Sequence, residues 1–469
     1  MAVYGGRLIM ATENTMVSTN SILNRWPTLV IASVIVVGIG FQLLPIAVAR
    51  AGAVLVLVVQ VLLERRAGSS NFLTSPLFLL GAVALVFYSL IVGVSDIPVS
   101  STNIEDIDTL FGSDAERAIV VFGLACIAMH AIAAQNPETA KAKAGTGPDQ
   151  GTFAIYLFAT IAVIISMVNV GNYLSMEFGG PHIGAIRSVA APAIAFCLLF
   201  LVHQSVRTSV SLKILIVVII ALSIAGMFYI QEGKKPLMIL LAALLFWLRL
   251  KNVSLARLVA VGVTTVVVAI VLLQIMQMIR VPHGSMVRGE AGSTMRMFKD
   301  VLTAKLVMRQ METQYCFQSV IDKHRGQSFA PSRQLFWLQG LVPRALWPKK
   351  PNLSLGKGYA LDYCGLWNGG PHSASITLLG QPVLHGGGAG LLLHGGFLLF
   401  CLGGLVWINR NPDSLSAVSI AALLPWLIDF DQDFALYTAN AVKFFLVMAP
   451  LIWLAAAQSR FSRSGARLQ

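Results

Sequence analysis

The residues best suited to chemistry lie in "LVPRALWPKKP" at 341–351, where three prolines stand among basic and aromatic side chains. Proline fixes its own φ and favours extended backbone in the residue before it, so this stretch is expected to be stiff. A stiff backbone would hold Arg344, Lys349 and Lys350 in fixed positions. Arginine binds two phosphate oxygens at once, and lysine adds a point charge. The stretch therefore predicts a phosphate-binding site, and the alternative is that these side chains only contact anionic lipid headgroups.

Further basic residues are expected on the same side of the membrane and are candidates for the same phosphate site: Arg187, Lys234, Lys235, Arg280 and Arg288. Chemistry at a phosphate site can also need a proton acceptor, a role that imidazole fills near neutral pH. His372 is the first candidate for this base and His385 the second, because each lies near glycines. A lone histidine is more often structural, and that is the competing interpretation for both.

A run of acidic residues, "DFDQD" at 429–433, has the Asp-x-Asp spacing that can hold a divalent cation. It falls at the predicted outer end of a membrane span, so we expect a polar turn at a helix end. In that turn, Asp429 or Asp431 would pair with a lysine or arginine. Neither CxxC nor HExxH spacing occurs in the chain. The sequence thus predicts neither a metal site nor a cofactor.

The composition predicts a membrane protein around these residues. Hydrophobic residues make up 56% of the 469 and charged residues 12%, against about 25% charged in a typical soluble domain. Crossing a bilayer takes about 20 mostly apolar residues in a helix. About twelve such runs predict an all-α polytopic fold: 27–45, 47–63, 73–94, 117–134, 152–172, 189–204, 212–230, 236–250, 256–279, 388–408, 415–430 and 439–457. Their interiors are expected to carry almost no ionisable residues.

The orientation follows from the lysines and arginines, which gather in every second loop. Both termini are then expected in the cytoplasm of a cell whose inner membrane holds the protein, and residues 280–386 outside. The net charge of +13 mostly reflects this topology, and nothing indicates nucleic-acid binding. The predicted organisation is a bundle of about nine helices at 1–279, a large partly helical external loop at 280–386, and about three helices at 387–469.

The external loop is predicted to be ordered. Apolar residues at helical spacing run from Ser293, a candidate N-cap, to Gly326, and predict an amphipathic helix. The glycine run "HGGGAGLLLHGG" at 385–396 predicts either close helix packing or close approach of a ligand. Cys316 and Cys364 share this loop, and the sequence leaves open whether they form a disulfide. Three other cysteines are expected to be packing residues inside spans: Cys126, Cys197 and Cys401.

Two stretches carry a family resemblance. "PRALWPKKP" at 343–351 and "SITLLGQPVLHGGGAG" at 375–390 resemble the external-loop motifs of the O-antigen or oligosaccharide repeat-unit polymerases (the Wzy-type family). Gln381 stands where the family pattern predicts glutamate, and "GKKP" at 233–236 carries lysine where relatives often carry arginine. The resemblance covers about a quarter of the chain by motif and the rest by its arrangement of spans.

The resemblance implies a metal-independent glycosyltransferase of the GT-C type. Its donor would be an oligosaccharide on undecaprenyl diphosphate, and its acceptor a second lipid-linked repeat unit. The product would be O-antigen or exopolysaccharide, made at the outer face of the cytoplasmic membrane. Membrane lipids, and a chain-length regulator as a candidate, would be its partners.

Two other function classes remain open from the sequence. An O-antigen ligase uses the same type of donor and differs in its acceptor. A twelve-span transporter or lipid-glycan flippase would have the same number of helices, but transporters tend to show internal repeats and charged or broken helices at the midplane. No clear repeat relates the two halves of this sequence.

Overall fold

A computed structural model describes residues 26–40, 42–90, 113–134, 152–177, 184–206, 208–229, 235–265, 309–342, 347–350, 356–365, 374–412 and 414–465. Within these ranges the chain forms helices joined by turns and contains no β-strand. The all-α prediction is therefore confirmed for the described part of the chain.

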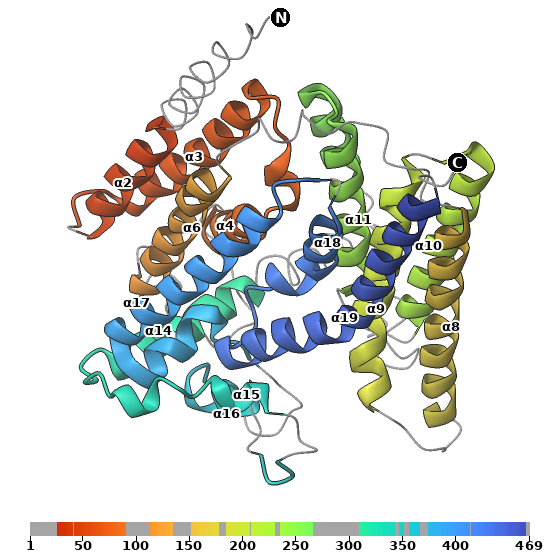
Figure 1. Ribbon diagram of the computed structural model, residues 1–469. Helices are drawn as coiled ribbons and strands as arrows, with labels where there is room; N and C mark the ends of the chain where they lie inside the picture. The colour runs from red at the N-terminus through yellow and green to blue at the C-terminus, as the bar shows by residue number, and fades with distance from the viewer. Residues whose placement is uncertain are drawn as a thin grey trace, which may run out of the picture.

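One side of the helix bundle, on the left in Figure 1, is built from the N-terminal helices. They are α2 (Trp26–Gly40), α3 (Ile46–Arg66), α4 (Pro76–Leu85) with a π-helical turn at Val86–Leu90, and α6 (Asp114–Ala133). Ser75 and Ser113 cap α4 and α6, because each hydroxyl accepts a hydrogen bond from a backbone N–H three residues on. Gly81 of α4 and Gly123 of α6 let these two helices touch, since a Cβ on Gly81 would lie 2.8 Å from the Gly123 carbonyl oxygen.

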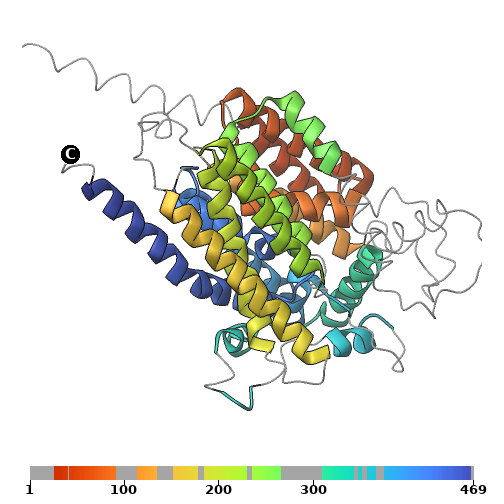
Figure 2. The same ribbon diagram turned by 90° about the vertical axis from the view of Figure 1, so that its right-hand side faces the viewer.

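The opposite side contains α8 (Thr152–Glu177), α9 (Gly184–Ser205) and α10 (Val210–Tyr229), which face the viewer in Figure 2. Phe158 of α8 packs against Phe196 and Phe200 of α9, and all three rings are buried. Between helices in a bilayer such contacts stabilise through van der Waals packing, since lipid tails are as apolar as the rings. This aromatic cluster therefore fixes α8 against α9.

Four helices fill the middle of the bundle: α11 (Lys235–Lys251), α17 (Thr377–Ile408), α18 (Leu415–Leu427) and α19 (Phe434–Gly465). Every residue of α18 from Ala417 to Leu427 is buried, because α9, α11 and α19 all pack on this helix. A further short helix, Leu255–Thr265, follows α11.

Six of the described helices are long and apolar enough to cross a bilayer: Ile46–Arg66, Asp114–Ala133, Phe153–Asn172, Val210–Met227, Thr377–Ile408 and Phe434–Gln458. Five more apolar helices are shorter: Trp26–Gly40, Pro76–Leu90, Val189–Ser205, Leu255–Thr265 and Leu415–Leu427. The chain is thus a polytopic helical protein of membrane type. The count of twelve spans, the division at 279 and 386, and the orientation stay predictions.

Hydrogen bonds between distant loops define two ends of the bundle. At the end that we call the Arg249 end, the Arg249 guanidinium bonds to Asn71, Thr74 and Asn409 at 2.6–2.9 Å. At the end that we call the Lys235 end, Lys235 pairs with Asp429, and the backbone N–H of Ala115 donates to Gln318. Loops that the sequence analysis placed inside meet at the first end, and those placed outside meet at the second.

Ionisable residues of α3 and α6 pair with one another at or near the ends of the predicted spans. Glu64 of α3 accepts from Ser69 at 2.7 Å and lies 3.6 Å from His130 of α6, whose other ring nitrogen meets Ser75. Arg50 pairs with Glu116 in the same two helices. Hydropathy averaged over a run does not identify such pairs, because the partner of each residue lies on another helix that is distant in the sequence. Cys126 and Cys197 are buried as predicted, whereas Cys401 lies exposed on α17.

Candidate functional site

A helical segment packs across the Lys235 end of the bundle, at the bottom of Figure 1. It contains α14 (Arg309–His324), a 3₁₀ turn at Pro331–Arg333, α15 (Leu338–Leu341) and α16 (Gly356–Asp362). Phe317 and Val320 of α14 are fully buried against the bundle. The predicted amphipathic helix is confirmed for 309–324, and its predicted start near Ser293 lies outside the described residues.

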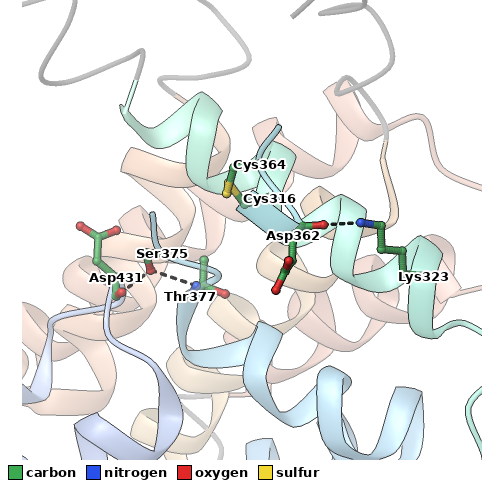
Figure 3. The surroundings of a disulfide bond; sticks show 7 residues. All are labelled: Cys316, Lys323, Asp362, Cys364, Ser375, Thr377 and Asp431. Carbon is green, nitrogen blue, oxygen red and sulfur yellow. Dashed lines mark hydrogen bonds between the residues drawn. A yellow bond between two sulfur atoms is a disulfide. The ribbon is translucent and has the colours of Figure 1, made fainter. Parts of the chain in front are cut away.

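A disulfide ties α16 to α14. Cys316 and Cys364 are 48 residues apart in sequence and bonded to each other, with their Cα atoms 4.6 Å apart (Figure 3). Beside it, the Lys323 ammonium donates to the carbonyl oxygen of Asp362. These two links hold α16 against α14, so the segment is a fixed part of the structure. Cys316 and Cys364 do form a disulfide, which the sequence had left open.

The turn between α18 and α19 carries the predicted acidic residues. Asp429 accepts from the Lys235 ammonium at 2.6 Å, and the same ammonium also donates to the Pro425 carbonyl oxygen at 3.0 Å. The side chain of Asp431 accepts from the Tyr88 hydroxyl. Its backbone carbonyl accepts from the Ser375 hydroxyl (Figure 3). The predicted polar turn with a paired Asp429 is confirmed. In the described residues no cluster of three metal-binding side chains occurs.

The third aspartate of the turn, Asp433, has a different environment. Its side chain is 7% exposed, no cation pairs with it within the described residues, and burial raises the pKa of its carboxyl to about 7. Tyr359 of α16 lies close by and is 2% exposed. Burial raises the pKa of the Tyr359 phenol, and the charges of Asp433 and Tyr363 raise it further, while Gln381 opposes the rise. The pair is thus a proton-binding carboxyl next to a neutral phenol.

Gln381 explains how α19 begins at this place. Its side-chain oxygen accepts from the backbone N–H of Ala435 at 2.8 Å, which satisfies one of the free donors in the first turn of α19. The side chain is 3% exposed. A glutamate would bury a charge there, and burying an unpaired charge is costly. The neutral amide of Gln381 therefore suits a capping role.

The glycine run bends α17 around Gln334. Gly387 has φ 56° and ψ −147°, a conformation that almost only glycine adopts. A Cβ on Gly386 would lie 2.7 Å from the Gln334 amide nitrogen, and that amide donates to the His385 carbonyl oxygen at 3.2 Å. Of the two predicted roles for these glycines, close packing is the one that the structure shows.

His385 lies directly before this bend. Its ring stacks on Phe336, with centroids 4.1 Å apart and planes at 16°. The neighbouring His394 is buried, and its ring nitrogens lie 2.9 and 3.0 Å from the carbonyl oxygens of Gly390 and Gln334. These contacts give both histidines a packing role at the junction of α15 and α17.

The predicted phosphate-binding residues are only partly described. Lys350 donates to the carbonyl oxygens of Gly340 and Val342 at 2.9 and 2.8 Å, and Lys349 is exposed beside it. Lys235 is committed to Asp429, so a phosphate would compete with that carboxylate. The others lie outside the described residues, Arg187 by its side chain only: Arg187, Lys234, Arg280, Arg288, Arg344 and the base candidate His372.

Sequence reasoning missed Asp433 and Tyr359. Asp433 belongs to the acidic run 429–433 that we considered as a metal motif. The spacing of that run does not indicate which of its three carboxyls is buried without a cation. Tyr359 carries no sequence signal, because only the fold brings α16 next to the start of α19.

Comparison with known protein families, with characterised proteins and with solved structures gives no match for this chain.

Proposed function

We propose that this protein is a membrane glycosyltransferase that joins lipid-diphosphate-linked oligosaccharide repeat units and works at the Lys235 end. The observation that carries the proposal is the Cys316–Cys364 disulfide. Disulfides persist in oxidising compartments and are rare in the cytosol. This supports an external position for the Lys235 end, which agrees with the orientation derived from lysine and arginine.

The fixed segment at this end suits a diphosphate. Lys350 reaches back to two carbonyl oxygens at the end of α15, which fixes its ammonium next to the exposed Lys349. Cations that are positioned in advance stabilise a leaving diphosphate without reorganisation during the reaction.

The chemistry asked of the protein is modest. An acceptor hydroxyl attacks the anomeric carbon of the donor sugar, the bond from that carbon to the diphosphate oxygen breaks, and the hydroxyl loses its proton to a base. Holding donor and acceptor together supplies much of the rate enhancement. Fixed cations neutralise the charge on the departing diphosphate.

The experiment compares cells that lack the gene with cells that carry it back as wild type, as Arg344→Ala or as Lys357→Ala. Wild type should restore long glycan chains, and Arg344→Ala should give single repeat units only while inserting normally in the membrane. Lys357 is an exposed lysine of α16 and serves as the matched control for loss of one positive charge. Normal chain length in Arg344→Ala would contradict the diphosphate role.

The deletion strain separates the alternatives by its products. Acceptors capped with a single repeat unit indicate a polymerase. Uncapped acceptors together with long chains on the lipid carrier indicate a ligase, and repeat units that never reach the outer face indicate a flippase.

A further inference from the structure

The turn before α19 presents one carboxyl that the structural network does not use. Asp429 is held by Lys235, and Asp431 by Tyr88. The side chain of Asp433, two residues further on, has no hydrogen bond or ion pair among the contacts of the described residues, and it keeps 7% exposure. A carboxyl that is buried without a cation lowers the stability of the fold. Folding alone therefore does not explain why this position carries an aspartate.

The phenol of Tyr359 gives independent evidence at the same place. Its hydroxyl is buried and has no partner within hydrogen-bond distance in the described part of the protein; the nearby polar side chain is that of Gln381, which already caps α19. Buried hydroxyls are normally hydrogen-bonded, because an unsatisfied one costs about 1–3 kcal/mol. Two polar groups on different elements, α16 and the start of α19, therefore share an environment in which neither is satisfied. A sugar hydroxyl, which both donates and accepts, complements such a pair.

We infer that Asp433 is the base that deprotonates the acceptor sugar hydroxyl, and that Tyr359 positions that hydroxyl. This inference rests on the proposed function and names the residues that act on the acceptor. Asp433 takes the proton as the hydroxyl oxygen bonds to the donor's anomeric carbon. The diphosphate leaves with the electron pair of the broken bond, and the proton passes from Asp433 to water before the next cycle.

The protonation behaviour of Asp433 fits this role. Burial raises the pKa of the carboxyl from 3.8 to about 7, and a base works best when its pKa lies near the working pH. Charged and titratable groups on the elements around it are Tyr359 and Asp362 of α16, Tyr363 after it, Asp429 and Asp431 in the same turn, Lys235 of α11, Tyr88 of the π-helical turn, and His385 and His394 of α17.

The first experiment measures chain extension by the purified protein with lipid-diphosphate-linked repeat units. General bases contribute about 10²–10⁴-fold, so Asp433→Asn should lower the rate at least a hundredfold. The wild-type rate should rise with pH and level off above about 7, and the residual rate of Asp433→Asn should not depend on pH in this range. Asp431→Asn removes a carboxylate from the same turn and should keep the wild-type pH profile.

Tyr359→Phe tests the positioning role. Loss of the hydroxyl should raise KM for the acceptor several-fold more than it lowers kcat, because the base remains. Equal kinetics of Tyr359→Phe and wild type would overturn this part.

A second measurement does not depend on activity. Burial raises the pKa of Asp433 from 3.8 in the unfolded chain to about 7 in the folded protein. The free energy of unfolding therefore decreases as the pH rises from about 4 to about 7, because only the unfolded chain loses this proton in that range. The thermal stability of wild type in detergent should therefore fall relative to Asp433→Asn between pH 5 and pH 8. A difference that stays constant with pH would contradict a buried titrating carboxyl.

The outcomes separate the inference from the proposed function. If Asp433→Asn extends chains at a rate within a few-fold of the wild-type rate, the role of Asp433 is overturned and the proposed function stands. Wild type that does not extend any lipid-linked repeat unit overturns both. An Asp433→Asn protein that folds, as judged by its melting transition, and fails to extend chains supports both.

Discussion

The bend in α17 allows a sharp test of why glycines fill this helix. Gly387 has φ 56° and ψ −147°, and holding a residue other than glycine there costs about 1–3 kcal/mol. A Cβ would also lie 3.1 Å from the Gln327 carbonyl oxygen, which must move away. Together these effects predict that Gly387→Ala destabilises the protein by about 2–4 kcal/mol.

The adjacent glycine is a matched control. A Cβ on Gly388 would meet nothing within 4 Å, and its φ lies outside the positive range. Alanine is favoured over glycine in a helix by about 0.5–1 kcal/mol, so Gly388→Ala should be neutral or slightly stabilising. The two variants differ by one position and make the same chemical change.

The assay is thermal unfolding of the purified protein in detergent, followed by intrinsic fluorescence. Trp337 packs against Phe397 of α17 and Phe434 of α19, so its surroundings change when this junction unfolds, and the total emission of the eight tryptophans follows unfolding of the whole protein. Gly387→Ala should melt well below wild type, and Gly388→Ala at or above it. Equal melting temperatures for the two variants would refute the argument that backbone conformation at the bend requires glycine.

Two further predictions concern links elsewhere in the fold. Replacing Cys316 and Cys364 by serine should speed proteolytic cleavage of the segment between α14 and α16. The chain-entropy estimate for a loop of 48 residues is about 4 kcal/mol, and a rate equal to that of the Cys401→Ser control would contradict a stabilising disulfide. Arg249→Ala should lower thermal stability by about 3 kcal/mol or more, because several buried acceptors lose their donor. Arg65→Ala, at a more exposed site of the same end, should cost about 1 kcal/mol, and an equal loss in both variants would argue against a central role for Arg249.

The sequence predicted well those features that depend on local pattern. Apolar runs correspond to helices throughout the described chain, and the apolar face around Phe317 and Val320 is buried as its spacing indicates. The polar turn at 429–433 also follows from its local sequence. Such features depend on residues that are a few positions apart, so hydropathy and periodicity are enough to predict them.

Features that depend on distant partners could not be predicted. Lys235 was predicted as a phosphate ligand because the sequence indicates on which side of the membrane it lies. Its partner Asp429 is 194 residues away in the sequence and could not be predicted. His385 appeared as a base because it lies among glycines, but its ring stacks on Phe336 from another element. Glu64 and His130 show the same limit inside the bundle. In each case the neighbour that bears on the side chain's role comes from the tertiary fold.

The Arg249 end has a consequence for how the protein can move. Five hydrogen bonds from one guanidinium join the loops after α3, α11 and α17, so these helices are clamped together there. A carrier that works by alternating access must open each end in turn, and opening this end would break the clamp. Under the proposed function, a clamp of this kind would leave a long glycan one route of departure, on the side where it is made. The bundle would then act as a rigid frame at that face, with no path for the polymer back through it.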